Sequence, residues 1–425
     1  MAVNAGCVYL VSTNFINNFE LKRNAIFPMI KLHKACYFLL LSLLCCRKPY
    51  NPPAIASPRS YLVVEGVINS GSDSTFIKLS QTVSLSSTVT VNPVLHAVLT
   101  VESDQNAIYP LTETSNGYYA SAGLNLDNTR QYRLRIQTNG EQYLSDFVPV
   151  VNSPAIDTVS YNIQSNGVQL NASTHDPKNN THYYRWSYNE TWIFHSDYDS
   201  QFMSNGDTVV ARPANDQIYQ CWASDTSSTI VLGSSAALSK DIINNKQITL
   251  VASTSEKLGV KYSILVNQYA LTGDAYNFWV NLKKNTEQLG SIFDAQPSEI
   301  NSNIHDITNP SVPVIGFVSV GAVANKRIFI TEQQLPRWTP VNPYPDSLCD
   351  FRTFLFHAPI LGTLAFYNQE NVYFNYLKNN GAGELYIPVD ALSRPGGPVT
   401  GHTGALPICV DCTLRGTNIQ PGFWR

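Results

Sequence analysis

Four cysteines in the body of this 425-residue chain could carry chemistry: Cys221, Cys349, Cys409 and Cys412. The last two form a C-x-x-C pair, a spacing found in zinc sites and in dithiol redox motifs. A zinc site needs two more ligands, and neither a second C-x-x-C nor an H-x₃-H pattern is present. A redox motif belongs at a strand-to-helix junction, whereas this pair lies in a tail rich in Gly and Pro. We therefore predict disulfides for all four cysteines, and the sequence leaves their three possible pairings open.

A second group of candidates lies in an aromatic stretch that reads YYRWSYNETWIF. Tyr184, Trp186 and Trp192 could stack against a sugar or a peptide, with Arg185 as a cation or carboxylate clamp. Alternatively, alternate aromatic residues in a strand form a sheet core, and the arginine reaches outward. The core interpretation is favoured, and the four residues remain candidates for ligand binding.

Other motifs with known chemistry are missing from the sequence. The eight histidines are scattered, and no pair has the H-E-x-x-H spacing that binds zinc from one helix face. Neither the G-x-S-x-G elbow of serine hydrolases nor a P-loop is present. Asp197 and Asp199 form a D-x-D pair that could touch calcium, but the glycine and distal glutamate of an EF-hand loop are missing. We expect no catalytic residue, metal or cofactor, although two carboxylates that meet only in the fold leave no short motif.

The composition favours strands. The chain has 23 Tyr and 18 Phe, and only 14% of its residues are charged. Tyr, Thr, Val and Ile favour strands, while Asn, Ser, Gly and Pro favour turns. The net charge of -3 offers no basic surface for nucleic acid and argues against electrostatic capture by anionic lipid. We expect a mainly β protein that does not bind nucleic acid.

The first folded segment is expected at residues 61–151. Its stretches YLVVEGVI, TFIKLS, HAVLTVES and YRLRIQ are rich in β-branched and aromatic residues. In the last stretch Tyr132, Leu134 and Ile136 face one way, and Asn139-Gly140 then supplies a tight hairpin turn. About seven such strands predict an immunoglobulin-like or transthyretin-like sandwich.

A larger β-rich domain with one or two helices is expected over residues 156–425. The segment 273–289 is the exception to the strand pattern, because its apolar residues recur near helical spacing. Thr272 is available as a cap and Gly290 as a stop. We predict a helix here that lies against a sheet.

Residues 29–45 have the features of a lipoprotein signal peptide. Two lysines precede about ten apolar residues, a length that reaches only half-way across a bilayer core. Cys46 follows the apolar run in the manner of a lipobox, in which the cleaved chain begins with a lipidated cysteine. Cys45 is the alternative modified residue, and a simple cleaved signal with two incidental cysteines is a further alternative.

The segments on either side of this signal are interpreted from it. Residues 46–60 are rich in proline and are expected to form an extended tether. Residues 1–28 precede a complete signal that has its own start at Met29. We interpret them as an upstream segment wrongly assigned to the protein.

Nearly all of the chain after Cys46 resembles one known family. The stretches that carry the resemblance include LVVEGVI, YYRWSYNETWIFHS, FWVNLKKNTEQLGSIFDAQPSEI, VIGFVSVGAVANKRIFI and CVDCTLRGTNIQPGFW. This family is the Bacteroidota lipoprotein family catalogued as domain of unknown function 4249. The resemblance implies a lipid-anchored outer-membrane protein, often met beside TonB-dependent receptors, and it brings no catalytic residues. The RKP after Cys46 lacks the acidic residues often linked to surface export, so the periplasmic and outer faces both stay open.

These observations lead to three hypotheses of different classes. The leading one is a non-enzymatic, lipid-anchored protein that binds a small molecule or glycan, or assists, beside a TonB-dependent receptor. The second is an envelope hydrolase that acts on glycans or peptides through a carboxylate pair. The third is an adhesion or assembly module, which would expose an apolar patch.

Overall fold

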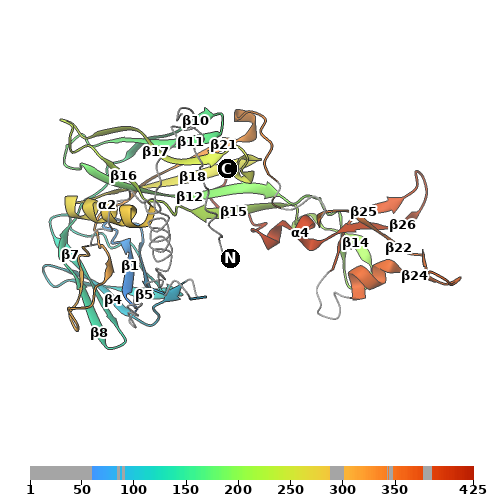
Figure 1. Ribbon diagram of the computed structural model, residues 1–425, viewed down its shortest axis with the longest axis horizontal. Helices are drawn as coiled ribbons and strands as arrows, with labels where there is room; N and C mark the ends of the chain where they lie inside the picture. Colours follow the sequence, from blue (N-terminus) through green and yellow to red (C-terminus); the bar gives the residue numbers. More distant parts are fainter. Residues whose placement is uncertain are drawn as a thin grey trace, which may run out of the picture. The chain divides into compact units, whose positions relative to one another are not determined.

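The computed structural model describes residues 60–83, 87–88, 91–287, 301–341, 343, 348–376 and 385–425. All of the described residues belong to one compact unit, Arg59–Arg425. The expected signal peptide, Cys45, Cys46, Gly290 and the tether up to residue 59 lie outside the described residues, as do residues 1–28. The prediction of a mainly β protein is confirmed, because strands make up most of the regular structure (Figure 1).

Eleven strands form the first sheet, in which every strand is hydrogen-bonded to a neighbour. They are β1 (Leu62–Val67), β2 (Thr75–Gln81), β3 (Asn92–Pro93), β4 (Val98–Ser103), β5 (Ile108–Ser115), β6 (Tyr118–Ser121), β7 (Gln131–Thr138), β8 (Glu141–Ser145), β9 (Val148–Pro149), β19 (Ile304–Asp306) and β20 (Ile315–Gly316). Their order is β19-β8-β7-β4-β5-β6-β2-β1-β20, with β3 beside β2 and β9 beside β7. The first half of β5 pairs with β4 and the second half with β6, so β5 joins the two halves of the sheet.

Buried and more exposed side chains alternate along β7, and the buried ones pack in the core of this sheet. Tyr132, Leu134 and Ile136 are at most 1% exposed and share one cluster with residues of β1, β2 and β4. Asn139 and Gly140 have φ values of 51° and 80°, which the two-residue turn between β7 and β8 requires. Alternation and turn chemistry therefore act as the sequence predicts.

The two-sheet sandwich predicted for residues 61–151 is not confirmed. The strands of this segment are joined into one sheet, and β19 and β20 are added to it from residues 304–316. β20 lies parallel to β1, with Val63 opposite Ile315. An edge strand offers unpaired backbone groups to any suitable segment, and periodicity does not identify the segment that takes the place.

A face-to-face pair of sheets occurs instead in the second region. One sheet consists of β10 (Ile156–Gln164), β11 (Gly167–His175) and β17 (Ile242–Ala252), and the other of β12 (Tyr183–His195), β15 (Gln220–Thr226), β16 (Val231–Ser234), β18 (Lys261–Ala270) and β21 (Ala324–Thr331). Side chains from both sheets, such as Leu170 and Trp186, form one buried cluster. The short 3-10 turns η2 (Glu256–Leu258) and η3 (Glu332–Gln334) follow β17 and β21.

Helix α2 (Gly273–Glu287) lies in the segment where the sequence predicts a helix. The Thr272 hydroxyl accepts a hydrogen bond from the backbone N–H of Ala275 at 3.2 Å, as an N-cap does. The helix contacts β12, where the rings of Tyr276 and Tyr183 lie 4.9 Å apart. It therefore covers part of a sheet face (Figure 1).

The C-terminal lobe, defined here as the described part of residues 348–414 with residues 197–219, has small cores of its own. Its elements are β13 (Phe202–Ser204), β14 (Val209–Ala211), η1 (Ala214–Asp216), β22 (Arg352–Leu355), β23 (Ala358–Pro359), β24 (Phe366–Tyr367), the π-helix η5 (Asn371–Tyr376), β25 (Ile387–Ser393), β26 (Val399–Ala405), α4 (Pro407–Val410) and η6 (Cys412–Leu414). The backbone N–H of Gln201 donates to Val389 O at 3.0 Å, which joins the two segments. Within the described residues, no helix has the length and apolar character needed to cross a membrane.

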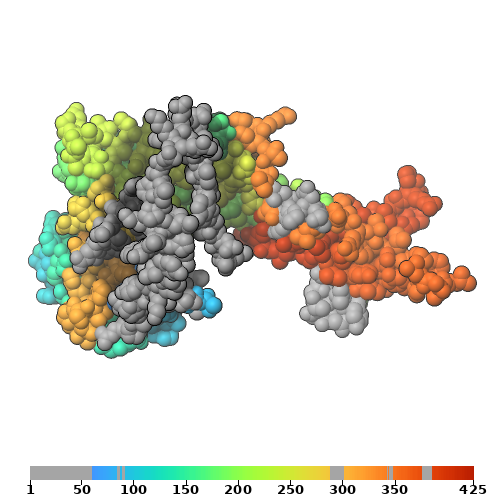
Figure 2. Space-filling model, in the orientation of Figure 1, coloured from blue at the N-terminus to red at the C-terminus, as the bar shows by residue number. Residues whose placement is uncertain are grey.

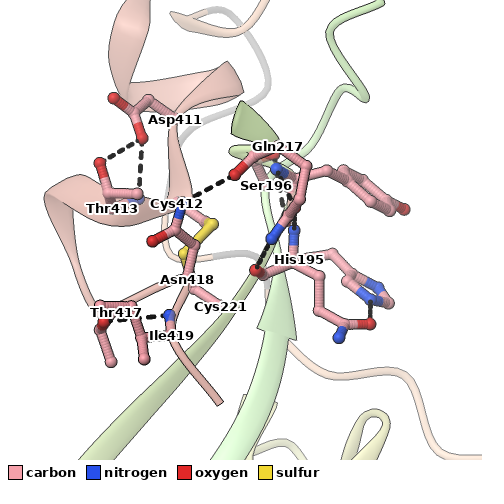
Figure 3. Close-up of a disulfide and its surroundings, with 12 residues drawn as sticks. His195, Ser196, Gln217, Cys221, Asp411, Cys412, Thr413, Thr417, Asn418 and Ile419 are labelled. Carbon is pink, nitrogen blue, oxygen red and sulfur yellow. Dashed lines mark hydrogen bonds between the residues drawn. A yellow bond between two sulfur atoms is a disulfide. The ribbon is translucent and has the colours of Figure 1, made fainter. Parts of the chain in front are cut away.

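Two disulfides confirm the prediction made for the four cysteines. Cys221 of β15 is bonded to Cys412, and Cys349 is bonded to Cys409. Figure 3 shows how the first bond brings the C-terminal segment beside β15, where Asn418 Nδ2 donates to Gln217 O at 2.9 Å. Each member of the C-x-x-C pair therefore has a partner far away in the chain.

Candidate functional site

The two faces of strand β12 have different environments. Side chains at even positions, such as Tyr184 and Trp186, point into the core between the sheets, where they are at most 1% exposed. Arg185 and Ser187 lie on the opposite face, because successive side chains of a strand alternate. The candidate site is built on this second face, beneath helix α2.

Two aromatic rings enclose the guanidinium of Arg185. Its carbon lies 4.2 Å from the ring centre of Tyr269, which is directly opposite on β18, and 4.3 Å from that of Trp279 on α2. The Ser187 and Tyr269 hydroxyl oxygens are 3.2 Å apart. Contacts of a cation with two ring faces stabilise its charge, more strongly where water is excluded.

Arg185 lies on the wall of a cavity of about 650 Å³. The cavity has an apolar side that includes Phe278, Trp279 and Leu282, and a polar side that includes Ser187 and the loop 227–230. Residues of β1 and β20 in the first sheet complete the wall. The volume falls in the range of small-molecule sites, and so does the mixture of apolar surface with a few polar groups.

Three charged side chains line this cavity: Glu65, Arg185 and Glu287. Two carboxylates line it, and each has a lysine partner: Glu65 lies 2.9 Å from Lys78, and Glu287 lies 3.3 Å from Lys283. Among the described residues, Arg185 has no carboxylate within ion-pair distance, and its Nε atom is buried without a hydrogen-bond partner. Burial lowers the pKa of the Arg185 guanidinium, but an arginine stays charged at neutral pH because its ordinary pKa exceeds about 12. The cavity therefore holds a cation whose charge the described residues leave unmatched.

This arrangement is suited to bind an anionic group. A guanidinium presents a planar set of donors that matches a carboxylate, and such bonds are about twice as strong as neutral ones. The neighbouring Trp279 and Phe278 rings offer apolar surface to the rest of a ligand. A carboxylate-bearing peptide end or acidic sugar has both features.

Two other hollows have comparable volumes, about 600 and 620 Å³, so volume alone does not single out a site. The second of these contains His175, whose Nδ1 lies 2.8 Å from Asp157. This contact with Asp157 raises the pKa of His175. Here the cationic form of the histidine already has an anionic partner, unlike Arg185.

The structure separates the four residues that the sequence proposes for ligand binding. Tyr184 and Trp186 stack on each other in the core, with ring centres 5.7 Å apart. Trp192 is 8% exposed and lies under the Lys257 ammonium, 4.8 Å away. Arg185 alone of these four lines the cavity, so the binding hypothesis for the three aromatic rings gains no support from their positions.

Sequence reasoning missed Tyr269 and the loop 227–230 as parts of this site. Tyr269 meets Arg185 only through the pairing of β12 with β18, and no local pattern contains that register. Trp279 belongs to the segment 273–289, where the sequence predicts a helix against a sheet, and the structure places its ring over Arg185. The amphipathic pattern of the helix could thus have indicated that Trp279 lies near a sheet, but it did not indicate that the ring contacts Arg185.

The cysteine and aspartate candidates offer no separate metal site. Asp197 lies near Cys349 and Cys409, but the two sulfurs are bonded to each other and provide no thiolate. The other disulfide, Cys221–Cys412, lies beside backbone hydrogen bonds such as that from Cys412 N to Ile218 O at 2.9 Å. Both disulfides act as covalent links between segments.

Comparison with protein families gives one match. The model of the family described as domain of unknown function DUF4249 matches residues 47–327. That range contains β12, β18 and α2, and hence the residues around the Arg185 cavity. A search of the curated proteins finds no match.

Among solved structures, the adhesin InvE of Yersinia pseudotuberculosis is similar to part of this chain. The identity is 14% and the TM-score is 0.13, and the match covers 50% of this chain and 55% of the adhesin. The chain thus spans about half the length of this structural neighbour. Similarity at this level supports no argument about function.

Proposed function

Since this chain belongs to the DUF4249 family, we propose that it is a non-enzymatic binding protein of the bacterial cell envelope. In this proposal a lipid on Cys46 anchors it to the outer membrane, and it delivers or retains a ligand beside a TonB-dependent receptor. The ligand occupies the Arg185 cavity. The receptor and the membrane are then partners, and the family resemblance supports both.

Independent features support an envelope location. The sequence before Cys46 has the order of a lipoprotein signal, with two lysines, an apolar run and a cysteine. The two disulfides suit an exported protein, because cytosolic thiols are kept reduced. These features address location, and the cavity addresses activity.

One observation carries the binding proposal: on a cavity wall, two aromatic rings enclose a half-buried cation that has a buried, unbonded Nε atom and no carboxylate partner among the described residues. Burying a charge without a matching one is costly in a folded protein. An anionic ligand group would supply the missing charge when it enters. The proposed ligand class is therefore a carboxylate joined to an apolar or sugar moiety.

A binding test can use matched pairs of probes that differ only at the carboxylate. Suitable pairs are oligogalacturonate and its methyl ester, and a free-acid peptide such as acetyl-Leu-Phe and its amide. Calorimetry on the full chain should detect an acid form that binds at least about tenfold more tightly than its neutral counterpart. Equal affinity of both forms, or binding of neither in both pairs, would contradict the carboxylate class.

Two substitutions locate the binding in the cavity. Arg185→Met should abolish the preference for the acid, since it removes the cation and keeps most of the volume. Arg327→Met is the matched control, because Arg327 also lies over a ring, at 3.6 Å from Phe423, but does not line the cavity. Loss of binding in both variants would point to a general loss of structure.

The receptor partnership has its own test. The tagged, lipidated protein is isolated from detergent-solubilised envelope, beside a Cys46→Ser form. Recovery of a TonB-dependent receptor with the lipidated form would support the partnership. If the lipidated protein remains in the membrane fraction but no receptor is recovered with it, the result would contradict the partnership. If the Cys46→Ser form still carried lipid, the assignment of Cys46 would be wrong.

A further inference from the structure

The hairpin of β23 and β24, in the C-terminal lobe, exposes an apolar tip. Leu361 and Leu364 are 96% and 99% exposed, the highest values among the large hydrophobic residues that the structure describes. Phe366 and Ile360 beside them are 62% and 40% exposed. Figure 2 shows this part of the chain, in orange, as a narrow projection of the lobe.

The hairpin also lacks charge. No Asp, Glu, Lys or Arg occurs from Thr353 to Gln369, a run that contains both strands and the turn. Single exposed leucines are common on protein surfaces, but several exposed apolar side chains gathered in one uncharged segment mark an interaction site. The composition of the tip is therefore typical of a surface that an apolar partner covers.

Several polar groups of the turn are already bonded within it. The N–H of Ile360 donates to Ala365 O at 3.0 Å, and the N–H of Thr363 donates to Ile360 O at 3.1 Å. The Thr363 hydroxyl donates to Ile360 O at 3.0 Å and accepts from the N–H of Ala365 at 3.1 Å. Internal bonding is what backbone requires before it can leave water for lipid, because lipid offers no hydrogen-bond partners.

We propose that the β23–β24 hairpin inserts its tip into the surface of a lipid bilayer. Leu361 and Leu364 enter the boundary between headgroups and acyl chains, and the rings of Phe366 and Tyr367 lie at the level of the headgroups, where aromatic residues are favoured. A protein partner fits the tip less well, since binding hot spots are rich in Trp, Tyr and Arg and poor in Leu. The contact is apolar, so it does not depend on anionic lipid.

The inference is independent of the Arg185 cavity and of the anchor on Cys46. It is tested on the full chain by attaching an environment-sensitive fluorophore to a cysteine introduced as Ala365→Cys, beside the tip leucines. A label on Ser74→Cys, in the exposed turn between β1 and β2, is the matched control. The protein is mixed with phosphatidylethanolamine–phosphatidylglycerol vesicles that contain lipids with a quencher in the upper acyl chain.

The expected result is quenching of the label at 365 that is severalfold stronger than quenching at 74 and unchanged between about 0.1 and 1 M salt. Leu361→Asn with Leu364→Asn should remove it, with a loss in affinity of the tip for lipid of about tenfold per leucine. The control pair Ile108→Asn with Ile419→Asn changes exposed residues outside the hairpin and should leave the quenching intact.

Three results would overturn the proposal. The label at 365 is not quenched, whether or not the protein is on the vesicles. Alternatively, the leucine variant is quenched like the parent. Finally, the label is shielded only when envelope proteins are added and without lipid quenching, which would identify a protein as the occupant of the tip. Because all four substituted residues are exposed, circular dichroism of the variants should match the parent and exclude unfolding as the cause.

Discussion

Two ionisable residues of the same strand, Glu190 and Arg185, lie in opposite situations. Glu190, on the core face of β12, is 5% exposed, lies 2.6 Å from Lys257 Nζ and accepts a hydrogen bond from the Tyr262 hydroxyl at 2.6 Å. Arg185, on the other face, has two aromatic rings and no carboxylate partner among the described residues. A buried charge with its partners is part of the fold, whereas an unmatched one is a place where a ligand can contribute.

Of the substitutions considered, Glu190→Gln is expected to lower the free energy of unfolding the most. The substitution leaves Lys257 half-buried without its nearest carboxylate, and the free energy of unfolding should fall by about 3 kcal/mol. Denaturant unfolding with the disulfides intact measures the change. A loss below about 1 kcal/mol would show that the Glu190–Lys257 pair behaves like an exposed ion pair. Glu190 and Arg185 would then not differ in what they contribute to stability.

Alkaline pH should weaken the same cluster. Burial and the negative charge of Glu190 raise the pKa of Tyr262; for Lys257, burial acts to lower the pKa, but the hydrogen bond and charge of Glu190 outweigh it and raise it. A raised pKa in the folded state means that stability is complete below the unfolded value, about pH 10, and is lost above it.

Unfolding measured between about pH 9 and 11 should therefore show a falling free energy, by up to roughly 1.4 kcal/mol per pH unit for each group. Tyr262→Phe removes one titrating group and should make the fall less steep. An identical slope in the variant and the parent would place the sensitivity elsewhere.

Arg185→Met tests whether the unpaired cation contributes to stability. The variant loses the ring contacts of the cation but also the cost of partly burying its charge, so the free energy of unfolding should stay the same or rise by up to roughly 2 kcal/mol. Thermal unfolding in the absence of ligand is the measurement. A loss of several kcal/mol would mean that Arg185 serves the fold, as Glu190 does.

The smallest effect is expected for Asp225→Asn. Asp225 is the second partner of Lys257, at 3.4 Å, but its side chain is 58% exposed. Exposed ion pairs contribute little, so the free energy of unfolding should change by less than about 1 kcal/mol. An effect as large as that of Glu190→Gln would show that Lys257 depends on both carboxylates equally.

Local patterns predicted those parts of the fold that depend on near neighbours. The alternation in β7, the Asn139-Gly140 turn and helix α2 with its Thr272 cap all lie where the sequence places them. The strand pattern did not reveal that β19 and β20 join the first sheet, because an edge can be filled by any suitable later segment.

The candidate site was only partly predictable. The sequence marked Arg185 as a residue that could clamp a carboxylate, and its position in a strand of alternating aromatics implied a face opposite to the core. It also marked Tyr184, Trp186 and Trp192, whose rings pack inside. Composition does not say which face of a strand a ligand meets, since both faces of β12 carry large residues.

By itself the sequence determined the mainly β class, the pairing of all four body cysteines into disulfides and the family, because these follow from composition, local periodicity and residue type. Only the tertiary structure decided which cysteines pair, and that Tyr269 and Trp279 hold Arg185 between them. Each of these contacts joins elements through strand register or helix docking. Such contacts are set by the packing of the whole chain, and no short segment encodes them.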